Sequence, residues 1–167
     1  DDAAQIAHVL ERVGGRVRVA VDEAEGEALL HVRRSLHPAM ERLGTTLIED
    51  VSVPRSALPA MFDEIVRIEG DYGLTIPTVA HAGDGNLHPN FVFEGPEVPD
   101  VVWRAADDLF RSALRLGGTL TGEHGIGVLK RRWLRDELGA RQWELQRDIK
   151  RLFDPTGILN PGVVFAD

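Results

Sequence analysis

The stretch that decides the fold is LTIPTVAHAGDGNLHPNFVF, residues 74–93. Two runs rich in β-branched and aromatic residues, 74–80 and 87–93, flank the turn segment Gly-Asp-Gly-Asn at 83–86. Asp-Gly between two such runs is typical of a tight turn that reverses the chain. The sequence therefore predicts an antiparallel hairpin in the middle of the chain.

N-terminal to the hairpin, the spacing of apolar residues alternates between helical and strand-like. It predicts a helix that ends at Gly14 and Gly15 and a half-buried strand over 17–21. A second helix, capped by Asp22 and Glu25, is interrupted or ended by Pro38. A strand over 47–53 comes next, and then a helix with Ser56 as N-cap that Gly70 and Gly73 close.

C-terminal to the hairpin, the sequence predicts a loop over 94–100, helices over 101–116, 128–138 and 140–153, and a short strand over 119–121. A hairpin among alternating elements favours an α+β fold over a purely parallel sheet. We expect a ferredoxin-like antiparallel sheet with helices on one face. Residues 1–153 would form this domain, and the turn-rich tail 154–167 would pack against another domain.

Bulk composition excludes several classes of function. The chain has 167 residues, 43% of them hydrophobic, a net charge of −8 and no cysteine. The acidic balance argues against a nucleic-acid partner, because phosphate binding needs clustered Lys and Arg. The lack of cysteine excludes disulfides, thiolate catalysis and cysteine-ligated metal sites within this chain. No apolar run is long enough to cross a bilayer, and we expect a cytoplasmic protein.

The first chemical constellation lies on the hairpin. His81 and His88 are seven apart, an odd offset that would put them on opposite faces of one regular strand. The Asp-Gly turn instead lets the two imidazoles converge. His88 and Asn90 share one strand face, and Leu87 takes the apolar one. Pro89, which has no N–H, is expected at a strand start or edge. The alternative to a functional site is that a histidine here only donates a hydrogen bond to a backbone carbonyl and that the turn has no further role.

The second constellation is Thr121-Gly-Glu-His-Gly-Ile-Gly127. Glycines free the backbone for a close approach, and adjacent Glu123 and His124 would point apart in an extended loop. Two imidazoles and one carboxylate, His81, His88 and Glu123, match a Zn, Mn or Fe site, with His124 left as a general base. Arg33 is a weaker candidate, for a substrate carboxylate. A surface loop at a helix start is the alternative for residues 121–127.

Several motifs in order resemble the C-terminal region of the flavin-linked oxidases that include the glycolate oxidase flavoprotein subunit, D-lactate dehydrogenases and D-2-hydroxyglutarate dehydrogenase. They cover nearly the whole chain: Leu29–Arg34, Pro54–Pro59, His81–His88, Gly122–Gly127 and Phe153–Gly162. The resemblance implies the cap or substrate domain of the vanillyl-alcohol-oxidase-type flavoprotein superfamily.

The resemblance also assigns roles. It implies that His81, His88 and Glu123 are metal ligands, that His124 is the catalytic base, and that Arg33 and Asn90 bind substrate. Asn86 and Asn160 would contact the flavin. The chain has Leu30 where the family commonly has Trp, and Ile48 where 2-hydroxyglutarate members have a lysine for the second carboxylate, which favours a monocarboxylate such as glycolate or lactate.

No segment of the chain resembles the FAD-binding domain of that family. We therefore expect an excised piece, or a chain that works with a flavin-binding domain upstream or in another subunit, and that is catalytically silent alone. The candidate partner is an iron–sulfur subunit that accepts electrons, and the candidate location is peripheral, on the inner face of the membrane. Two rival hypotheses are a free-standing metal- or ligand-binding module without redox activity and, weaker, a metal-dependent hydrolase.

Overall fold

The structure, a computed structural model, describes residues 2–165 and forms two compact units, Asp1–Arg42 and Leu43–Asp167. The first contains α1 (Asp2–Arg12), α2 (Glu23–Arg34) and α3 (Leu36–Glu41). The Asp22 carboxylate accepts the N–H of Glu25 at 2.8 Å, and Glu25 in return accepts the N–H of Val21 at 2.9 Å. The predicted N-terminal cap is confirmed. Helix α2 ends at Arg34, and Pro38 lies within the first turn of the short helix α3, so the break comes at Ser35 and not at the proline.

The predicted strand over 17–21 is wrong. These residues form no strand, and the side chains of Val19 and Val21 are 52% and 87% exposed. A strand needs a neighbouring strand for its backbone N–H and C=O groups. None of the strands in the described residues lies alongside this segment. Alternating Val and Arg supplied the side-chain pattern of a strand without supplying that partner.

The second unit is built on a small antiparallel sheet. Its strands are β1 (Thr45–Ile48), β2 (Val51–Ser52), β3 (Thr78–His81) and β4 (Asn86–Phe93). Strands β3 and β4 form the predicted hairpin, which is confirmed. Strands β1 and β2 pair with β4 in one continuous register, since Ile48 lies opposite Asn90 and Val51 opposite Leu87.

The break between β1 and β2 lies opposite Pro89. This proline accepts the N–H of Glu49 at 2.9 Å but has no N–H to donate in return. The expectation that Pro89 marks a strand start or edge is wrong, because β4 is paired along both edges. On the other edge the N–H of Asn90 donates to Pro77 O at 3.1 Å. The missing donor costs the central strand one hydrogen bond and leaves its register intact.

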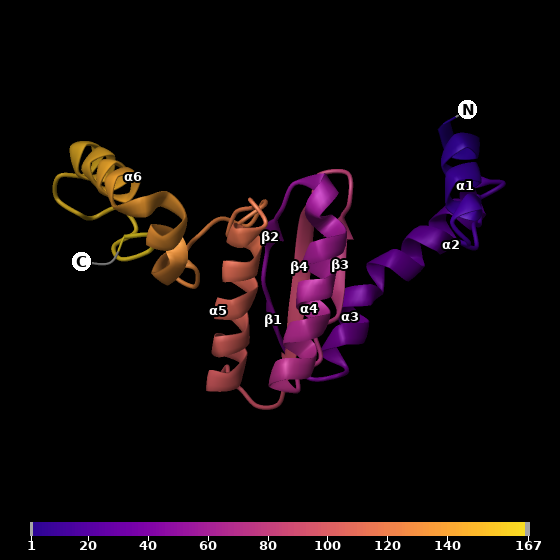
Figure 1. The fold of residues 1–167 in the computed structure, drawn as a ribbon, viewed down its shortest axis with the longest axis horizontal. Helices are drawn as coiled ribbons and strands as arrows, with labels where there is room; N and C mark the ends of the chain where they lie inside the picture. The colour runs from indigo at the N-terminus through magenta and orange to yellow at the C-terminus, as the bar shows by residue number, and fades with distance from the viewer. Residues whose placement is uncertain (1, 166–167) are drawn as a thin grey trace. The chain divides into compact units, whose positions relative to one another are not determined.

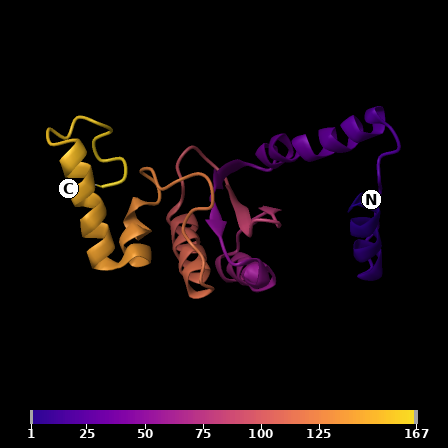
Figure 2. The same cartoon turned by 90° about the horizontal axis from the view of Figure 1, so that it is seen from above.

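Two helices cover one face of this sheet. Helices α4 (Leu58–Tyr72) and α5 (Asp100–Arg115) lie side by side (Figure 1), and the turned view shows both on the same side of the strands (Figure 2). The side chain of Leu87, predicted on the apolar face of the hairpin, is buried in the core with residues of both helices, and so are those of Phe91 and Phe93. The opposite face of the hairpin is left for the polar side chains.

The helix ends differ from expectation where the capping chemistry differs. Ser56 lies in a short 3-10 turn, η1 (Arg55–Ala57), and the N-cap of α4 is Ala57, which makes no side-chain hydrogen bond. Gly73 ends α4 in the left-handed conformation (φ 63°), as predicted, but Gly70 lies inside the helix. Ser56 therefore begins a turn before the helix and not the helix itself.

The C-terminal part confirms two predicted helices. The segment α6 (Arg131–Phe153) is broken at Gly139, whose φ of 69° and ψ of 166° are not helical. The first helix begins at Arg131 and not at residue 128. The predicted strand 119–121 is reduced to one antiparallel bridge between Thr119 and Ser52. Within residues 2–165, no helix has both the length and the apolar character to cross a bilayer.

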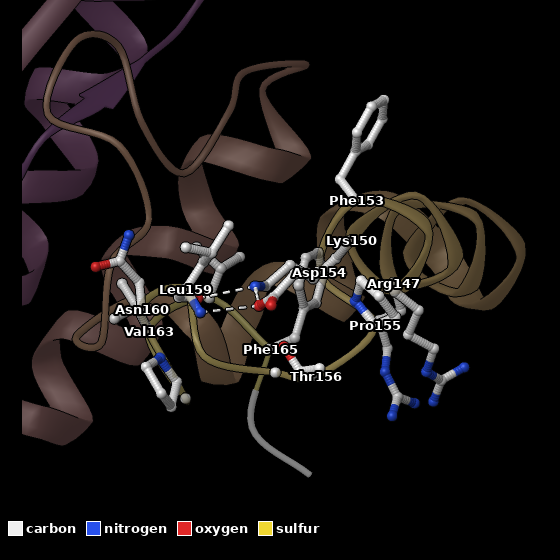
Figure 3. A pocket seen from close by; sticks show the side chains of 15 residues that line it. Arg147, Lys150, Phe153, Asp154, Pro155, Thr156, Leu159, Asn160, Val163 and Phe165 are labelled. Carbon is white, nitrogen blue, oxygen red and sulfur yellow. Dashed lines mark hydrogen bonds and ion pairs between the residues drawn. The ribbon is translucent and has the colours of Figure 1, made fainter.

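The tail that follows α6 folds back on the end of that helix (Figure 3). The Asp154 carboxylate accepts the N–H groups of Ile158 and Leu159, both at 3.0 Å, and also pairs with Lys150. Charged and capping contacts thus hold the first turns of the tail. Residues 166–167 of the predicted tail lie outside the described residues.

Candidate metal centre

The hairpin register places the two predicted histidines on one face. Val79 lies opposite His88 and His81 opposite Asn86, so His81 and His88 are diagonal neighbours across β3 and β4. Their ring centroids are 5.2 Å apart. Because the chain reverses at residues 82–85, two histidines seven positions apart lie on the same face of the hairpin. The predicted convergence is confirmed.

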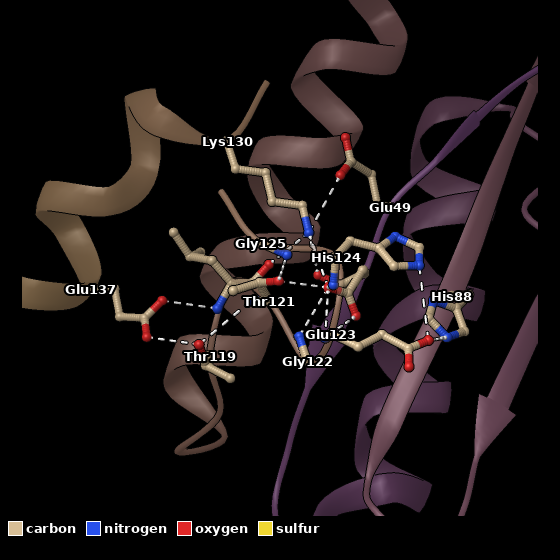
Figure 4. Close-up of polar contacts among 12 residues, drawn as sticks. Glu49, His88, Thr119, Thr121, Gly122, Glu123, His124, Gly125, Lys130 and Glu137 are labelled. Carbon is tan, nitrogen blue, oxygen red and sulfur yellow. Dashed lines mark hydrogen bonds and ion pairs between the residues drawn. The ribbon is translucent and has the colours of Figure 1, made fainter. Parts of the chain in front are cut away.

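Glu123 completes the cluster from a distant segment. Its Oε1 lies 3.0 Å from His88 Nε2 (Figure 4) and 3.6 Å from His81 Nε2. One ligand atom of each residue lies within 4.8 Å of the others. Atoms that bind one transition-metal ion at about 2.0–2.2 Å are at most about 4.4 Å apart, so a small inward movement would seat a cation. The structure thus brings together His81, His88 and Glu123.

His124 lies beside this cluster. Its Nε2 is 3.8 Å from Glu123 Oε1, and its ring stacks on that of His88 with centroids 4.9 Å apart. The expectation that Glu123 and His124 point apart is wrong, because the loop turns there and is not extended. A third imidazole next to the carboxylate is placed to exchange a proton or to supply a further nitrogen ligand.

The cluster is buried on one side and open on the other. The side chain of His88 is 12% exposed, and those of His81 and Glu123 are 40% and 52% exposed. Burial, followed by the charge of His124, lowers the pKa of His88. A lowered pKa favours the neutral imidazole, the form that binds metals. The open side is accessible to solvent.

Asp50 is a site residue that the sequence analysis missed. Its carboxylate is fully buried and accepts hydrogen bonds from the Thr121 hydroxyl (2.7 Å) and from the N–H groups of Gly122 (2.9 Å) and His124 (3.0 Å). Burial alone would raise the pKa of Asp50, but these bonds and the charge of Lys130 outweigh it and lower the pKa to about 2. Asp50 is therefore a carboxylate at neutral pH.

Lys130 and Glu49 are two more buried charges that were missed. Lys130 Nζ donates to Asp50 O at 2.6 Å and to Leu120 O at 3.0 Å. Glu49 Oε2 lies 4.0 Å from the same ammonium, and both Glu49 carboxylate oxygens lack hydrogen-bond partners among the described residues. The sequence held one signal, since two adjacent acids interrupt an otherwise apolar predicted strand.

The two asparagines of β4 are buried beside the histidines. Asn90 Nδ2 donates to Pro77 O (3.1 Å) and His88 O (2.7 Å), and its Oδ1 has no donor among the described residues. Asn86 packs against Gly122, where an added Cβ would lie 2.3 Å from Asn86 Oδ1. Gly122 is thus needed for the loop to approach β4. The predicted contacts of Asn90 with substrate and of Asn86 with flavin stay predictions.

Two predicted site residues lie elsewhere in the chain. Arg33 is an exposed side chain in the last turn of α2, in the first unit, and its neighbour Arg34 pairs with Glu27 at 3.3 Å. Asn160 is an exposed residue of the tail with a φ of 46° (Figure 3). Their roles in substrate and flavin binding also stay predictions.

Comparison with known proteins adds a family. Residues 1–164 match the model of the FAD-linked oxidase C-terminal domain. The chain is 41% identical over 90% of its length to glycolate oxidase subunit GlcD of Bacillus subtilis, and 36% identical over 98% to a D-lactate dehydrogenase of Archaeoglobus fulgidus. It spans 33% and 37% of these relatives, about a third of their length. The chain belongs to the FAD-linked oxidase family and corresponds to its C-terminal domain.

Proposed function

We propose that this chain supplies the metal, substrate and catalytic-base residues of an FAD-dependent dehydrogenase for a small 2-hydroxy acid. The observation that carries the proposal is the convergence of His81 and His88 on the Glu123 carboxylate, with the His124 imidazole beside it. Relatives named glycolate oxidase subunit and D-lactate dehydrogenase support the substrate class.

The donor set fits a divalent cation such as Zn²⁺, Mn²⁺ or Fe²⁺. Imidazole nitrogens and a carboxylate oxygen suit these ions, and three ligands leave positions for substrate oxygens. His81, His88 and Glu123 would hold it, and the Nε2 atoms of the two histidines are the nitrogens that face Glu123 Oε1. When bound, the cation would lower the pKa of a 2-hydroxyl group, and FAD would take the C2 hydrogen with its electron pair.

The chain's own residues then have distinct tasks. His124 accepts the proton of the 2-hydroxyl group, so the hydroxy acid becomes a 2-oxo acid by losing one proton and one hydride. Arg33 pairs with the substrate carboxylate. Asn90 Oδ1, which accepts no hydrogen bond from the described residues, accepts one from a hydroxyl group of the substrate. Ile48 lies opposite Asn90, on the face that carries His88. Its apolar side chain favours a monocarboxylate of the glycolate or D-lactate type.

We further infer a ferredoxin-like cap domain over residues 1–153, with 154–167 as a tail toward a flavin-binding domain. The order strand, α4, β3, β4, α5 and the Thr119–Ser52 bridge supports this type of sheet. Exposed apolar side chains support the missing domain as a partner: Val9 (57%), Val13 (79%), Leu152 (76%), Phe153 (77%) and Ile158 (72%). An iron–sulfur subunit and a cytoplasmic location, peripheral on the inner membrane face, complete the proposal.

Metal analysis and turnover test this function. The full-length protein with its flavin domain should oxidise glycolate or D-lactate with an artificial electron acceptor. A His81→Ala/His88→Ala variant should lose both the cation and turnover, and His124→Gln should lose turnover with the cation retained. Equal, negligible metal in wild type and the double variant would refute the metal site. A bound cation without turnover of any 2-hydroxy acid would support the binding-module alternative.

A further inference from the structure

Apart from their contacts with the cluster histidines, the side chains of Glu123 and His124 have little protein around them. They are 52% and 47% exposed, and they extend from a segment that has no helix or strand between Thr121 and Gly127. Glycines at three positions of that segment give its backbone wide freedom in the unfolded chain. The geometry of the cluster therefore depends on what fixes this backbone.

One carboxylate fixes it. The consecutive N–H groups of Gly122, Glu123 and His124 all point at Asp50 Oδ2, at 2.9, 3.2 and 3.0 Å. The Thr121 hydroxyl donates to the same oxygen at 2.7 Å and accepts the N–H of Gly125 at 2.8 Å. Successive N–H groups that converge on one anion form a nest, and bonds to a charged acceptor are stronger than neutral ones.

Asp50 is itself fixed to the strand that carries the rest of the site. The register between β1, β2 and β4 places it opposite His88. Lys130, which is 4% exposed, donates to the backbone oxygens of Asp50 and Leu120 and so joins the strand to the segment before the loop. The backbone of the loop is thus tied to the histidine strand through a buried charge, in addition to the contacts among the site side chains.

We propose that Asp50 is the positioning residue of this centre: its carboxylate sets the backbone of residues 122–124 so that Glu123 and His124 meet the two hairpin imidazoles. The inference deepens the proposed function and rests on it. The Asp50 carboxylate is fully buried and acts through the amides that it holds. Removing its charge should leave the hairpin intact and release the loop, which lowers cation affinity and alters the coordination geometry.

The test is a titration of the full chain with Co²⁺, whose visible absorption reports coordination geometry. Asp50→Asn keeps the size of the side chain but loses its charge. It should weaken Co²⁺ binding about tenfold or more, the range known for residues that support metal ligands, and change the shape of the absorption band. The control is Asp107→Asn, which loses the negative charge that pairs with Arg111 at 2.8 Å, away from the cluster. The control should lower the thermal midpoint while affinity and band stay unchanged.

The outcomes separate this inference from the proposed function. If wild type binds no Co²⁺, the metal site itself fails. If wild type binds and Asp50→Asn binds equally with the same band, the positioning role is overturned and the metal site stands. Should Asp50→Asn not fold, Thr121→Val decides. It removes one donor to Asp50 and should weaken binding several-fold, and unchanged affinity and absorption in that variant overturn the role.

Discussion

The two segments that build the cluster hold their side chains in different ways. The hairpin of β3 and β4 places His81 and His88 by strand register, which repeats along its backbone and needs only neighbouring residues. The loop 121–127 places Glu123 and His124 through hydrogen bonds to Asp50, a residue 71 to 74 positions away. Local sequence therefore positions the two histidines, whereas tertiary contacts position Glu123 and His124.

The contrast implies separate sensitivities. Changes to the hairpin should remove ligands from a scaffold that stays in place, since Leu87 and Phe91 anchor its other face in the core. Changes to the buried charges that support the loop should lower the stability of the fold and also displace Glu123 and His124. The predictions below test this division, and the first concerns the support of the loop.

Lys130→Met should have the largest effect. It leaves the buried carboxylates of Glu49 and Asp50 without their cation, and such losses cost about 3–5 kcal/mol of stability. Chemical denaturation measures the free energy of unfolding, and hydrogen exchange should show faster exchange at Gly122 and His124 than at β4. Lys150→Met, at the end of α6, is the control. An equal loss of protection in β4 and the loop would erase the proposed distinction.

Glu49→Gln should change the pH dependence of stability. Burial, opposed by the charges of Lys130 and Arg132, raises the pKa of Glu49 to about 7. A carboxyl group with a raised pKa stabilises the fold when protonated, so this contribution is lost as pH rises from about 4.5 through 7. The loss amounts to about 3 kcal/mol.

Unfolding of wild type and Glu49→Gln from pH 5 to 8 measures this effect. Wild type should lose stability over that range relative to the variant. Exposed Glu94 offers the control Glu94→Gln, which should follow wild type. Parallel curves for wild type and Glu49→Gln would contradict the raised pKa of Glu49.

His88→Ala removes a ligand from the hairpin. Cation affinity should fall more than about 100-fold, since the loss of supporting residues alone costs 10–100-fold. The thermal midpoint without cation should change little, because His88 lies on the polar face of β4. Calorimetric titration with Zn²⁺ or Mn²⁺ checks the affinity, with the exposed His37→Ala as the matched imidazole control. Retained binding would remove His88 from the ligand set.

Gly122→Ala should have the smallest effect. The new Cβ would lie 2.3 Å from Asn86 Oδ1, so the loop must move away from β4. Cation affinity should fall about tenfold with the fold preserved. Gly83→Ala, where no atom lies within 4 Å of the added Cβ, should bind as wild type does. Equal affinity in both variants would mean that the loop tolerates displacement.

The sequence by itself determined the hairpin, the ligand types and most helices. Turn chemistry at Asp84-Gly85 and alternation along β4 are local signals, and they placed His81 and His88 on one face correctly. The break at Gly139 and the end of α4 at Gly73 were likewise readable, because glycine conformations are local. The same local reading failed at residues 17–21, where a strand pattern had no partner.

Only the tertiary structure decided which buried charges support the site. Glu49, Asp50 and Lys130 are charged residues that a one-dimensional reading places on the surface, yet all three are at most 4% exposed. Their burial depends on the pairing of β1 and β2 with β4 and on the return of the chain after α5. The sequence determined which ligands the centre has, because the donor atom is fixed by the type of side chain. The placing of Glu123 against the two hairpin histidines came from contacts between segments more than 70 residues apart.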